Sequence, residues 1–122
     1  MDGVSERPWS GIARSSYPSA EAYCAACVID ENPIGAAKAK DRCKLPVYEP
    51  PALGGLLNRR GVRAAAARLV RVGGGVAAPE PVRVAAAARL LRLYGVIGER
   101  PPPSLVALAG RAATVQGPAP GL

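Results

Sequence analysis

The stretch that decides the predicted fold covers residues 58–95 and reads NRRGVRAAAARLVRVGGGVAAPEPVRVAAAARLLRLYG. Apolar side chains recur in it at helical spacing over residues 59–72 and again over residues 81–94. Asn58 is expected to open the first helix and a run of glycines to stop it, and Pro81 suits the first turn of the second. We therefore predict two helices that pair as an antiparallel hairpin across a short connection.

Each of these predicted helices has an apolar face and a face that carries arginine. The apolar residues of the first helix are Val62, Ala65, Ala66 and Leu69, and the arginines opposite them are Arg60, Arg63, Arg68 and Arg71. The apolar residues of the second helix are Val84, Ala87, Leu90, Leu91 and Tyr94, with Arg89 and Arg92 facing away. Because alanine buries little area, we expect these helices to approach each other closely.

We assign the chain to the mainly α class. It is expected to be a small helical domain built on the antiparallel helical hairpin, with extended Pro/Gly-rich arms and little or no sheet. A chain of 122 residues is one domain at most. We expect residues 1–17 to form a flexible N-terminal arm, residues 18–112 the single domain and residues 113–122 a flexible C-terminal tail.

Outside the hairpin, the sequence indicates shorter elements. Ser19 is the N-cap residue expected for a helix over residues 20–30, AEAYCAACVID. Residues 34–43, IGAAKAKDRC, favour a further turn or two of helix, and residues 44–55, KLPVYEPPALGG, favour extended chain. Ser104 is the expected N-cap of a short last helix.

The composition excludes several classes of protein. The chain has no histidine, which removes Ser-His-Asp and Cys-His catalytic groups and the commonest zinc ligand. Its carboxylates are scattered and form no evident acid/base pair, so we expect a protein that is not an enzyme. No apolar run spans a membrane and no secretory signal is found. We therefore expect a cytoplasmic protein with reduced thiols.

The basic residues are 13 arginines and 3 lysines. A high genomic GC content produces such a bias, and a thermophilic source fits it as well. In some hyperthermophiles intracellular disulfides are more common than in other organisms. The composition therefore qualifies the expectation of reduced thiols.

The cysteines, Cys24, Cys27 and Cys43, leave three interpretations open. A zinc site would need a fourth ligand from Asp30, Asp41, a water molecule or a cysteine of a neighbouring subunit. A disulfide would join Cys43 to Cys24 or Cys27 and would stabilise the small core by roughly 3 kcal/mol. The interpretation that we favour treats the cysteines as small, buried apolar residues, with Cys24 and Cys27 on the inward face of a helix.

The positive charge is concentrated in the second half of the chain. Residues 55–122 carry ten arginines against two glutamates, a net charge of +8, whereas residues 1–54 have a net charge of −1. Such a block favours contact with a polyanion or with an acidic protein surface. The candidate contact residues are Arg59, Arg60, Arg63, Arg68, Arg71, Arg89 and Arg92. The alternative is that arginine only solvates exposed helix faces.

The order of motifs along the chain resembles a small family of phage and prophage proteins. The matching segments are Trp9–Gly11, Lys44–Pro46, Asn58–Ala66, Gly74–Pro79, Ala87–Tyr94 and Pro102–Leu105. Members of this family occur alone or as an appendage to prohead proteases and other head-gene products of tailed phages. The protease domain itself has no counterpart in this chain. The resemblance therefore implies a phage-head setting and no catalytic role.

These observations lead to one main functional hypothesis and two alternatives. The main hypothesis is a non-enzymatic structural protein of a phage or prophage head that binds capsid or other head-assembly proteins. It would be found in the host cytoplasm during assembly, and in the virion if it stays with the head. The alternatives are a basic helical protein that binds nucleic acid, and a small adaptor stabilised by zinc. No cofactor is expected under the first two hypotheses, and no membrane partner under any of them.

Overall fold

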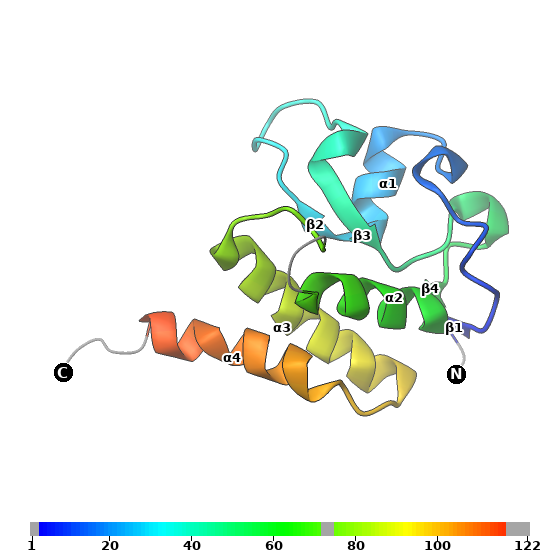
Figure 1. Cartoon of the computed structure of the whole chain (residues 1–122). Helices are drawn as coiled ribbons and strands as arrows, with labels where there is room; N and C mark the ends of the chain where they lie inside the picture. The colour runs from blue at the N-terminus through cyan, green and yellow to red at the C-terminus, as the bar shows by residue number, and fades with distance from the viewer. Residues whose placement is uncertain (1–2, 72–74, 117–122) are drawn as a thin grey trace. The chain divides into compact units, whose positions relative to one another are not determined.

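The computed structural model describes residues 3–71 and 75–116 (Figure 1). The chain forms two compact units, Met1–Ala65 and Ala66–Leu122, which we describe separately. Helix accounts for 52% of the chain and strand for 12%, in two small sheets. The prediction of a mainly α fold with little or no sheet is therefore wrong, because the fold is a mixture of α and β structure.

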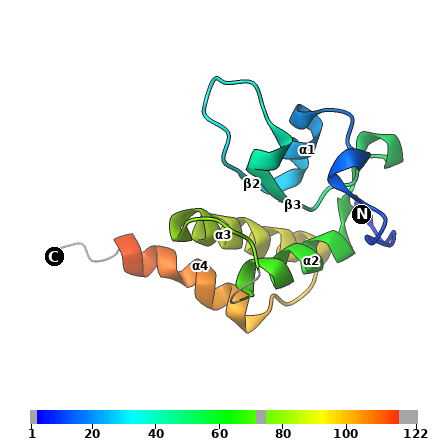
Figure 2. The same cartoon turned by 45° about the horizontal axis from the view of Figure 1, so that its top comes forward.

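The first unit combines a short helix, two small sheets and the start of a longer helix. Helix α1 spans Ala20–Ala26, and the antiparallel strands β2 and β3 span Cys27–Asp30 and Cys43–Pro46. The parallel strands β1 and β4 span Val4–Ser5 and Leu57–Asn58, and helix α2 spans Arg59–Val70. Three 3-10 turns lie at Arg14–Ser16, Lys40–Arg42 and Pro51–Leu53. Figure 2 shows α1 beside the β2–β3 pair.

The helix predicted over residues 20–30 ends early, at Ala26, and the chain continues as β2. Its start is as predicted, since the Ser19 Oγ accepts a hydrogen bond from the Ala22 N–H at 3.1 Å. The next residues include Val28 and Ile29, which are buried and β-branched and therefore suit a strand. A short apolar run has the same appearance in a buried helix and a buried strand, and pairing with β3 decides between them.

The segment before β3 contains less helix than predicted. Over residues 34–43 only the turn Lys40–Arg42 is helical, and it is a 3-10 turn. Within β3, Leu45 has a φ angle of 65°, which is rare for a side chain of this size. The Leu45 side chain is buried, and Val47 donates a hydrogen bond to the Ala26 carbonyl oxygen at 2.8 Å. These contacts hold the unusual backbone in place.

The N-terminal residues, expected to be a flexible arm, make specific contacts within the first unit. Val4 pairs with Leu57 in the β1–β4 sheet. The Trp9 ring lies so close to Gly61 in α2 that a Cβ atom added at Gly61 would be 3.1 Å from it. The Tyr17 side chain is buried, and its hydroxyl group donates a hydrogen bond to a backbone carbonyl 31 residues further along. This segment is therefore part of the packed structure.

The second unit consists of the end of α2 and two further helices, α3 at Glu80–Ile97 and α4 at Pro103–Gln116. Helices α3 and α4 run antiparallel and pack along each other (Figures 1 and 2). Within the second unit, α3 and α4 form a helical hairpin, a pair that was not predicted from the sequence. Of the expected C-terminal tail, residues 117–122 lie outside the described residues.

The ends of α3 and α4 differ from the predicted ends. Helix α3 continues through Gly95 and ends where Gly98 adopts a φ angle of 74°, as is typical of a C-terminal glycine. Helix α4 already includes Pro103, so Ser104 lies inside its first turn and is not its N-cap. Proline fits this turn because its missing N–H would have no partner within the helix. Leu105 is fully buried.

The apolar faces of α2 and α3 are close to those predicted. The buried apolar side chains of α2 are Val62, Ala65, Ala66 and Leu69. The buried residues of α3 are Val84, Ala86, Ala87, Leu90, Tyr94 and Ile97. Leu91, predicted on the apolar face, is only half-buried. Helical periodicity therefore identified the buried side of each helix without identifying the neighbour that covers it.

Candidate functional site

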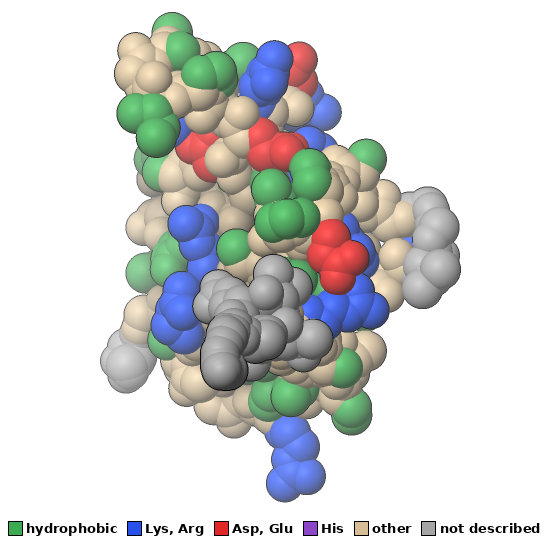
Figure 3. Space-filling model, turned by 90° about the vertical axis from the view of Figure 1, so that its left-hand side faces the viewer, with side chains coloured by type: hydrophobic (Ala, Val, Ile, Leu, Met, Phe, Trp, Pro, Cys, Tyr) green, Lys and Arg blue, Asp and Glu red, His purple; other side chains and the backbone are tan. Residues whose placement is uncertain are grey.

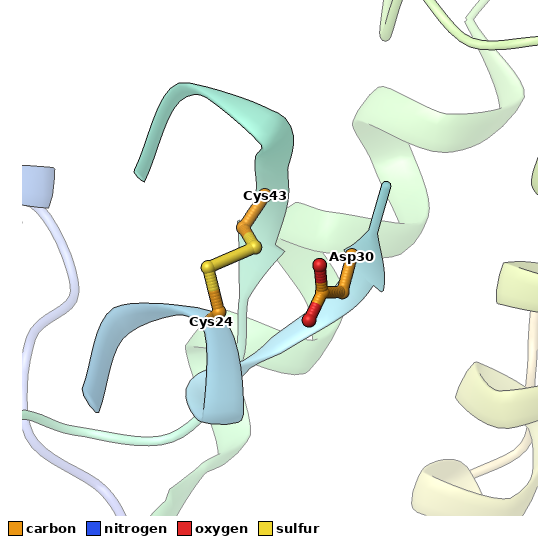
Figure 4. Close-up of side chains that lie close together, drawn as sticks. All are labelled: Cys24, Asp30 and Cys43. Carbon is orange, nitrogen blue, oxygen red and sulfur yellow. A yellow bond between two sulfur atoms is a disulfide. The ribbon is translucent and has the colours of Figure 1, made fainter. Parts of the chain in front are cut away.

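Three side chains that can bind a metal meet where α1, β2 and β3 come together (Figure 4). Cys24 lies in α1, Asp30 at the end of β2 and Cys43 at the start of β3. The sulfur and carboxylate oxygen atoms all lie within 4.8 Å of one another, and the two sulfur atoms form a disulfide. Asp30 and Cys43 are partners in the β2–β3 ladder, which places their side chains on the same face of the sheet.

Asn32 joins this group through its side-chain amide. The Asn32 Nδ2 donates a hydrogen bond to Asp30 Oδ1 at 2.8 Å and lies 3.2 Å from the Cys43 Sγ and 3.5 Å from the Cys24 Sγ. The Asn32 Oδ1 accepts a hydrogen bond from the Ala39 N–H at 2.8 Å, which orients the NH2 group toward the sulfur atoms. Asn32 is not among the predicted site residues. The Asp-x-Asn spacing, typical of an Asx turn, is the signal that marks it.

The Asp30 carboxylate keeps its negative charge. Lys38 forms an ion pair with Asp30 Oδ2, and Asn32 donates to Oδ1 through both its backbone and its side chain. The hydrogen bond from Lys38, together with those from Asn32, lowers the pKa of Asp30 to about 2 against the opposing effect of partial burial. At neutral pH this carboxylate is therefore ionised and can bind a cation.

Two of the predicted candidate ligands lie outside the group. Cys27 is the first residue of β2 and is buried with a free thiol. Burial raises the pKa of Cys27 to about 12, so the thiol stays protonated and behaves as a small apolar side chain. Asp41 is exposed in the 3-10 turn before β3. The structure therefore brings Cys24, Cys43 and Asp30 together.

The predicted arginines of the first unit lie in the first turns of α2. Arg59 is engaged by an ion pair, since its Nε donates to the Glu6 carboxylate at 2.8 Å. Arg60 and Arg63 are exposed on the same helix. Arg59 therefore helps to hold the N-terminal segment, and Arg60 presents positive charge to solvent.

The predicted arginines of the second unit are all exposed: Arg68, Arg71, Arg89 and Arg92. A further arginine, Arg83, is half-buried and donates a hydrogen bond to the Leu69 carbonyl oxygen at 2.8 Å, near the C-terminal end of α2. On the face drawn in Figure 3, the basic side chains of the described residues are dispersed among acidic and apolar ones.

The connection between β3 and β4 carries exposed apolar side chains, and we call residues 48–56 the apolar loop. Tyr48, Leu53 and Leu56 are 37%, 39% and 43% exposed. Backbone hydrogen bonds hold the loop, including those from Glu49 N to the Leu56 carbonyl oxygen at 2.8 Å and from Gly55 N to the Pro50 carbonyl oxygen at 3.2 Å. The sequence predicted extended chain here, and the structure shows an ordered loop.

A buried polar cluster joins Glu49 of the apolar loop to Asn58 of β4. Glu49 and Asn58 are both buried, and Asn58 Nδ2 donates to Glu49 Oε2 at 2.9 Å. The Asn58 Oδ1 accepts a hydrogen bond from the Gly61 N–H at 2.8 Å, so Asn58 opens α2 as predicted. Burial alone would raise the pKa of Glu49, but hydrogen bonds from Ser5 and Asn58 and the charge of Arg7 outweigh it and hold the pKa below its usual value.

Comparison with known proteins adds no relative. No protein-family model, curated protein or solved structure matches this chain. Within residues 3–71 and 75–116, no helix combines the length and the hydropathy that crossing a bilayer requires. Functional inference therefore rests on the residues themselves.

Proposed function

We propose that this protein is a non-enzymatic interaction protein of a phage or prophage head. It binds another head protein through the apolar loop and through Arg60, which is exposed at the start of α2. The observation that carries the proposal is the apolar loop, in which Tyr48, Leu53 and Leu56 are exposed although hydrogen bonds order the backbone that presents them. The phage-head setting rests on the resemblance of the sequence motifs.

The composition of this surface favours a protein partner over a phosphate backbone. Tyrosine and arginine are enriched in protein interfaces, and a few buried anchor residues carry most of the binding energy. Arg60 follows Leu56 closely in the chain and adds positive charge for an acidic partner. Because the apolar loop is already ordered, it loses less conformational entropy on binding than a flexible segment does.

Co-sedimentation with proheads of the same phage tests this proposal. The purified protein is mixed with proheads assembled without it, and the pelleted fraction is measured. The double variant Leu53→Asp/Leu56→Asp should lose co-sedimentation, because charge replaces two apolar contacts that the partner buries. Both side chains are exposed in the free protein, so the variant is expected to fold.

Ile34→Asp is the matched control for this experiment. Ile34 is a fully exposed apolar residue on the connection between β2 and β3, away from the apolar loop in the chain. The control should sediment with proheads as the wild type does. Equal losses in the control and the double variant, or full binding by the double variant, would refute the apolar loop as the interface.

DNA binding is a second candidate, favoured by the exposed arginines Arg68, Arg71 and Arg92. Arginine suits phosphate because its planar group donates two parallel hydrogen bonds. A gel-shift series at increasing salt separates the two candidates, since binding through phosphates weakens steeply with salt. DNA binding that the triple variant Arg68→Ala/Arg71→Ala/Arg92→Ala abolishes, with no binding to proheads, would replace the first proposal with the second.

A further inference from the structure

We propose that the reduced form of the Cys24–Cys43 pair binds one zinc ion, with Cys24, Cys43 and Asp30 as its protein ligands. In the disulfide form, the three ligand groups already lie within 4.8 Å of one another and face the same space (Figure 4). Thiolates and carboxylates are established zinc ligands, and three protein ligands leave one tetrahedral position for water. This inference is independent of the apolar loop and of the proposed function.

Little movement is needed for the pair to open around an ion. Tetrahedral zinc with Zn–S bonds of about 2.3 Å separates two sulfur ligands by roughly 3.8 Å. The Cα atoms of Cys24 and Cys43 are 5.3 Å apart. Rotation of the two side chains about their Cα–Cβ bonds therefore separates the sulfur atoms while the backbone stays in place. Asp30 stays on the same side because of its ladder pairing with Cys43.

The residues around the ligands suit a metal–thiolate centre. The Asn32 Nδ2 lies 3.2 Å and 3.5 Å from the two sulfur atoms, where an N–H group stabilises the negative charge of thiolates. Two thiolates and one carboxylate give the zinc site a net charge of −1. Lys38, which is ion-paired with Asp30, compensates that charge. The cysteines are buried and the Asp30 side chain is partly exposed, so the water position faces solvent.

The disulfide must be reduced before the metal binds, and a dithiol supplies the two electrons. One thiolate of the dithiol attacks a sulfur atom of the Cys24–Cys43 bond, which breaks and leaves a mixed disulfide. The second thiol of the reductant then closes its own disulfide, and both cysteines are released as thiols. Zinc displaces the two thiol protons to solvent and forms two Zn–S bonds and one Zn–O bond to Asp30.

Titration of the reduced full-length chain with Co²⁺ tests this inference, because Co²⁺ is a coloured substitute for Zn²⁺. The protein is reduced with a dithiol, freed of reductant and oxygen, and titrated with cobalt chloride. We expect one equivalent of cobalt to bind, with a thiolate-to-cobalt charge-transfer band and the d–d bands of tetrahedral coordination. Zinc should remove both, and the oxidised protein should show neither. Reduced protein without the charge-transfer band would overturn the proposal.

Two pairs of variants identify the ligands. Asp30→Asn and Cys24→Ser remove proposed ligands, and their matched controls, Asp41→Asn and Cys27→Ala, remove a carboxylate and a thiol outside the group. Zinc affinity is measured by competition with a chromophoric chelator. We expect affinity to fall by about tenfold or more in the first pair and to stay unchanged in the controls. Unchanged affinity in Asp30→Asn, or loss of the cobalt band in Cys27→Ala, would show that the proposed ligand set is wrong.

Reduction of the disulfide can unfold the first unit, and far-ultraviolet circular dichroism detects this by a loss of helical signal. The cobalt titration is then followed by circular dichroism as well as by absorbance. Metal binding then contributes to folding, as it does in small structural zinc domains. In that case cobalt should restore the helical signal and the charge-transfer band at the same molar ratio. If cobalt restores neither, the proposal fails.

Discussion

Removal of the Cys24–Cys43 disulfide is expected to destabilise the first unit strongly. The cross-link joins residues 19 positions apart in the sequence. In the chain-entropy model, a loop of this length restricts the unfolded chain enough to stabilise the folded state by about 3 kcal/mol at 25 °C. The double variant Cys24→Ala/Cys43→Ala should lose that amount and, in addition, the packing of two buried sulfur atoms.

The variant Cys27→Ala measures the packing loss separately. Cys27 is buried and has a free thiol, so its replacement removes one buried sulfur atom and no cross-link. A loss of roughly 1 kcal/mol is expected for it. Twice the Cys27→Ala loss, subtracted from the loss of the double variant, leaves the contribution of the cross-link. That remainder should be about 3 kcal/mol.

Urea unfolding of the oxidised proteins, followed by circular dichroism in the presence of a chelator, provides these free energies. A thiol titration of the denatured, unreduced wild type accompanies it and should find the single free thiol of Cys27. Two results would refute the reasoning. One is a titration that finds all three cysteines as thiols. The other is a double variant that loses no more than twice the Cys27→Ala value.

Three further outcomes follow from individual contacts. Folding lowers the pKa of Glu49 below its ordinary value of 4.5. The ionised side chain therefore stabilises the fold fully above pH 4.5, and this stabilisation is lost as the pH falls below 4.5. In a plot of the urea unfolding midpoint against pH, the decline at acid pH should be shallower for Glu49→Gln than for the wild type. An equally steep decline in this variant would contradict the stabilising role of the ionised Glu49 side chain. Gly61→Ala gains about 1 kcal/mol of helix propensity but places a methyl group 3.1 Å from the Trp9 ring. Gly61→Ala should therefore raise the free energy of unfolding more in a Trp9→Ala background than in the wild type. A double-mutant cycle with no coupling between the two positions would exclude the contact between residue 61 and the Trp9 ring. Arg83→Met removes a hydrogen bond to the end of α2 and should cost about 1 kcal/mol in thermal unfolding. The exposed control Arg92→Met should cost clearly less, and equal losses would refute the role of that hydrogen bond.

The helical parts of the structure could be predicted from the sequence because helical periodicity is local. Val62 and Leu69 are buried on α2 as predicted, and Ser19 and Asn58 open their helices through side-chain hydrogen bonds. The α3–α4 pair was not predicted because packing depends on residues far apart in the chain. Alanine-lined helices resemble one another, and the sequence alone does not distinguish the α3–α4 pair from an α2–α3 pair.

The sheet of the first unit could not be predicted for a related reason. The run Cys27–Asp30 has the apolar character of either a buried helix or a buried strand. Its strand conformation depends on hydrogen bonds to Cys43–Pro46, which lies beyond a long connection. The buried position of Glu49 was also not predicted. Nothing in a Pro-rich segment with a single glutamate indicates that this side chain will be buried and will accept a hydrogen bond from Asn58.

The sequence by itself determined the absence of histidine, the positive charge of the second half, the buried sides of α2 and α3 and two helix starts. These properties depend on composition or on neighbours within one or two helical turns. Only the tertiary structure decided which cysteine pairs with Cys43, and which carboxylate and amide lie beside that pair. The physical reason is that the ladder between β2 and β3 sets these distances, and a ladder joins residues that the sequence separates.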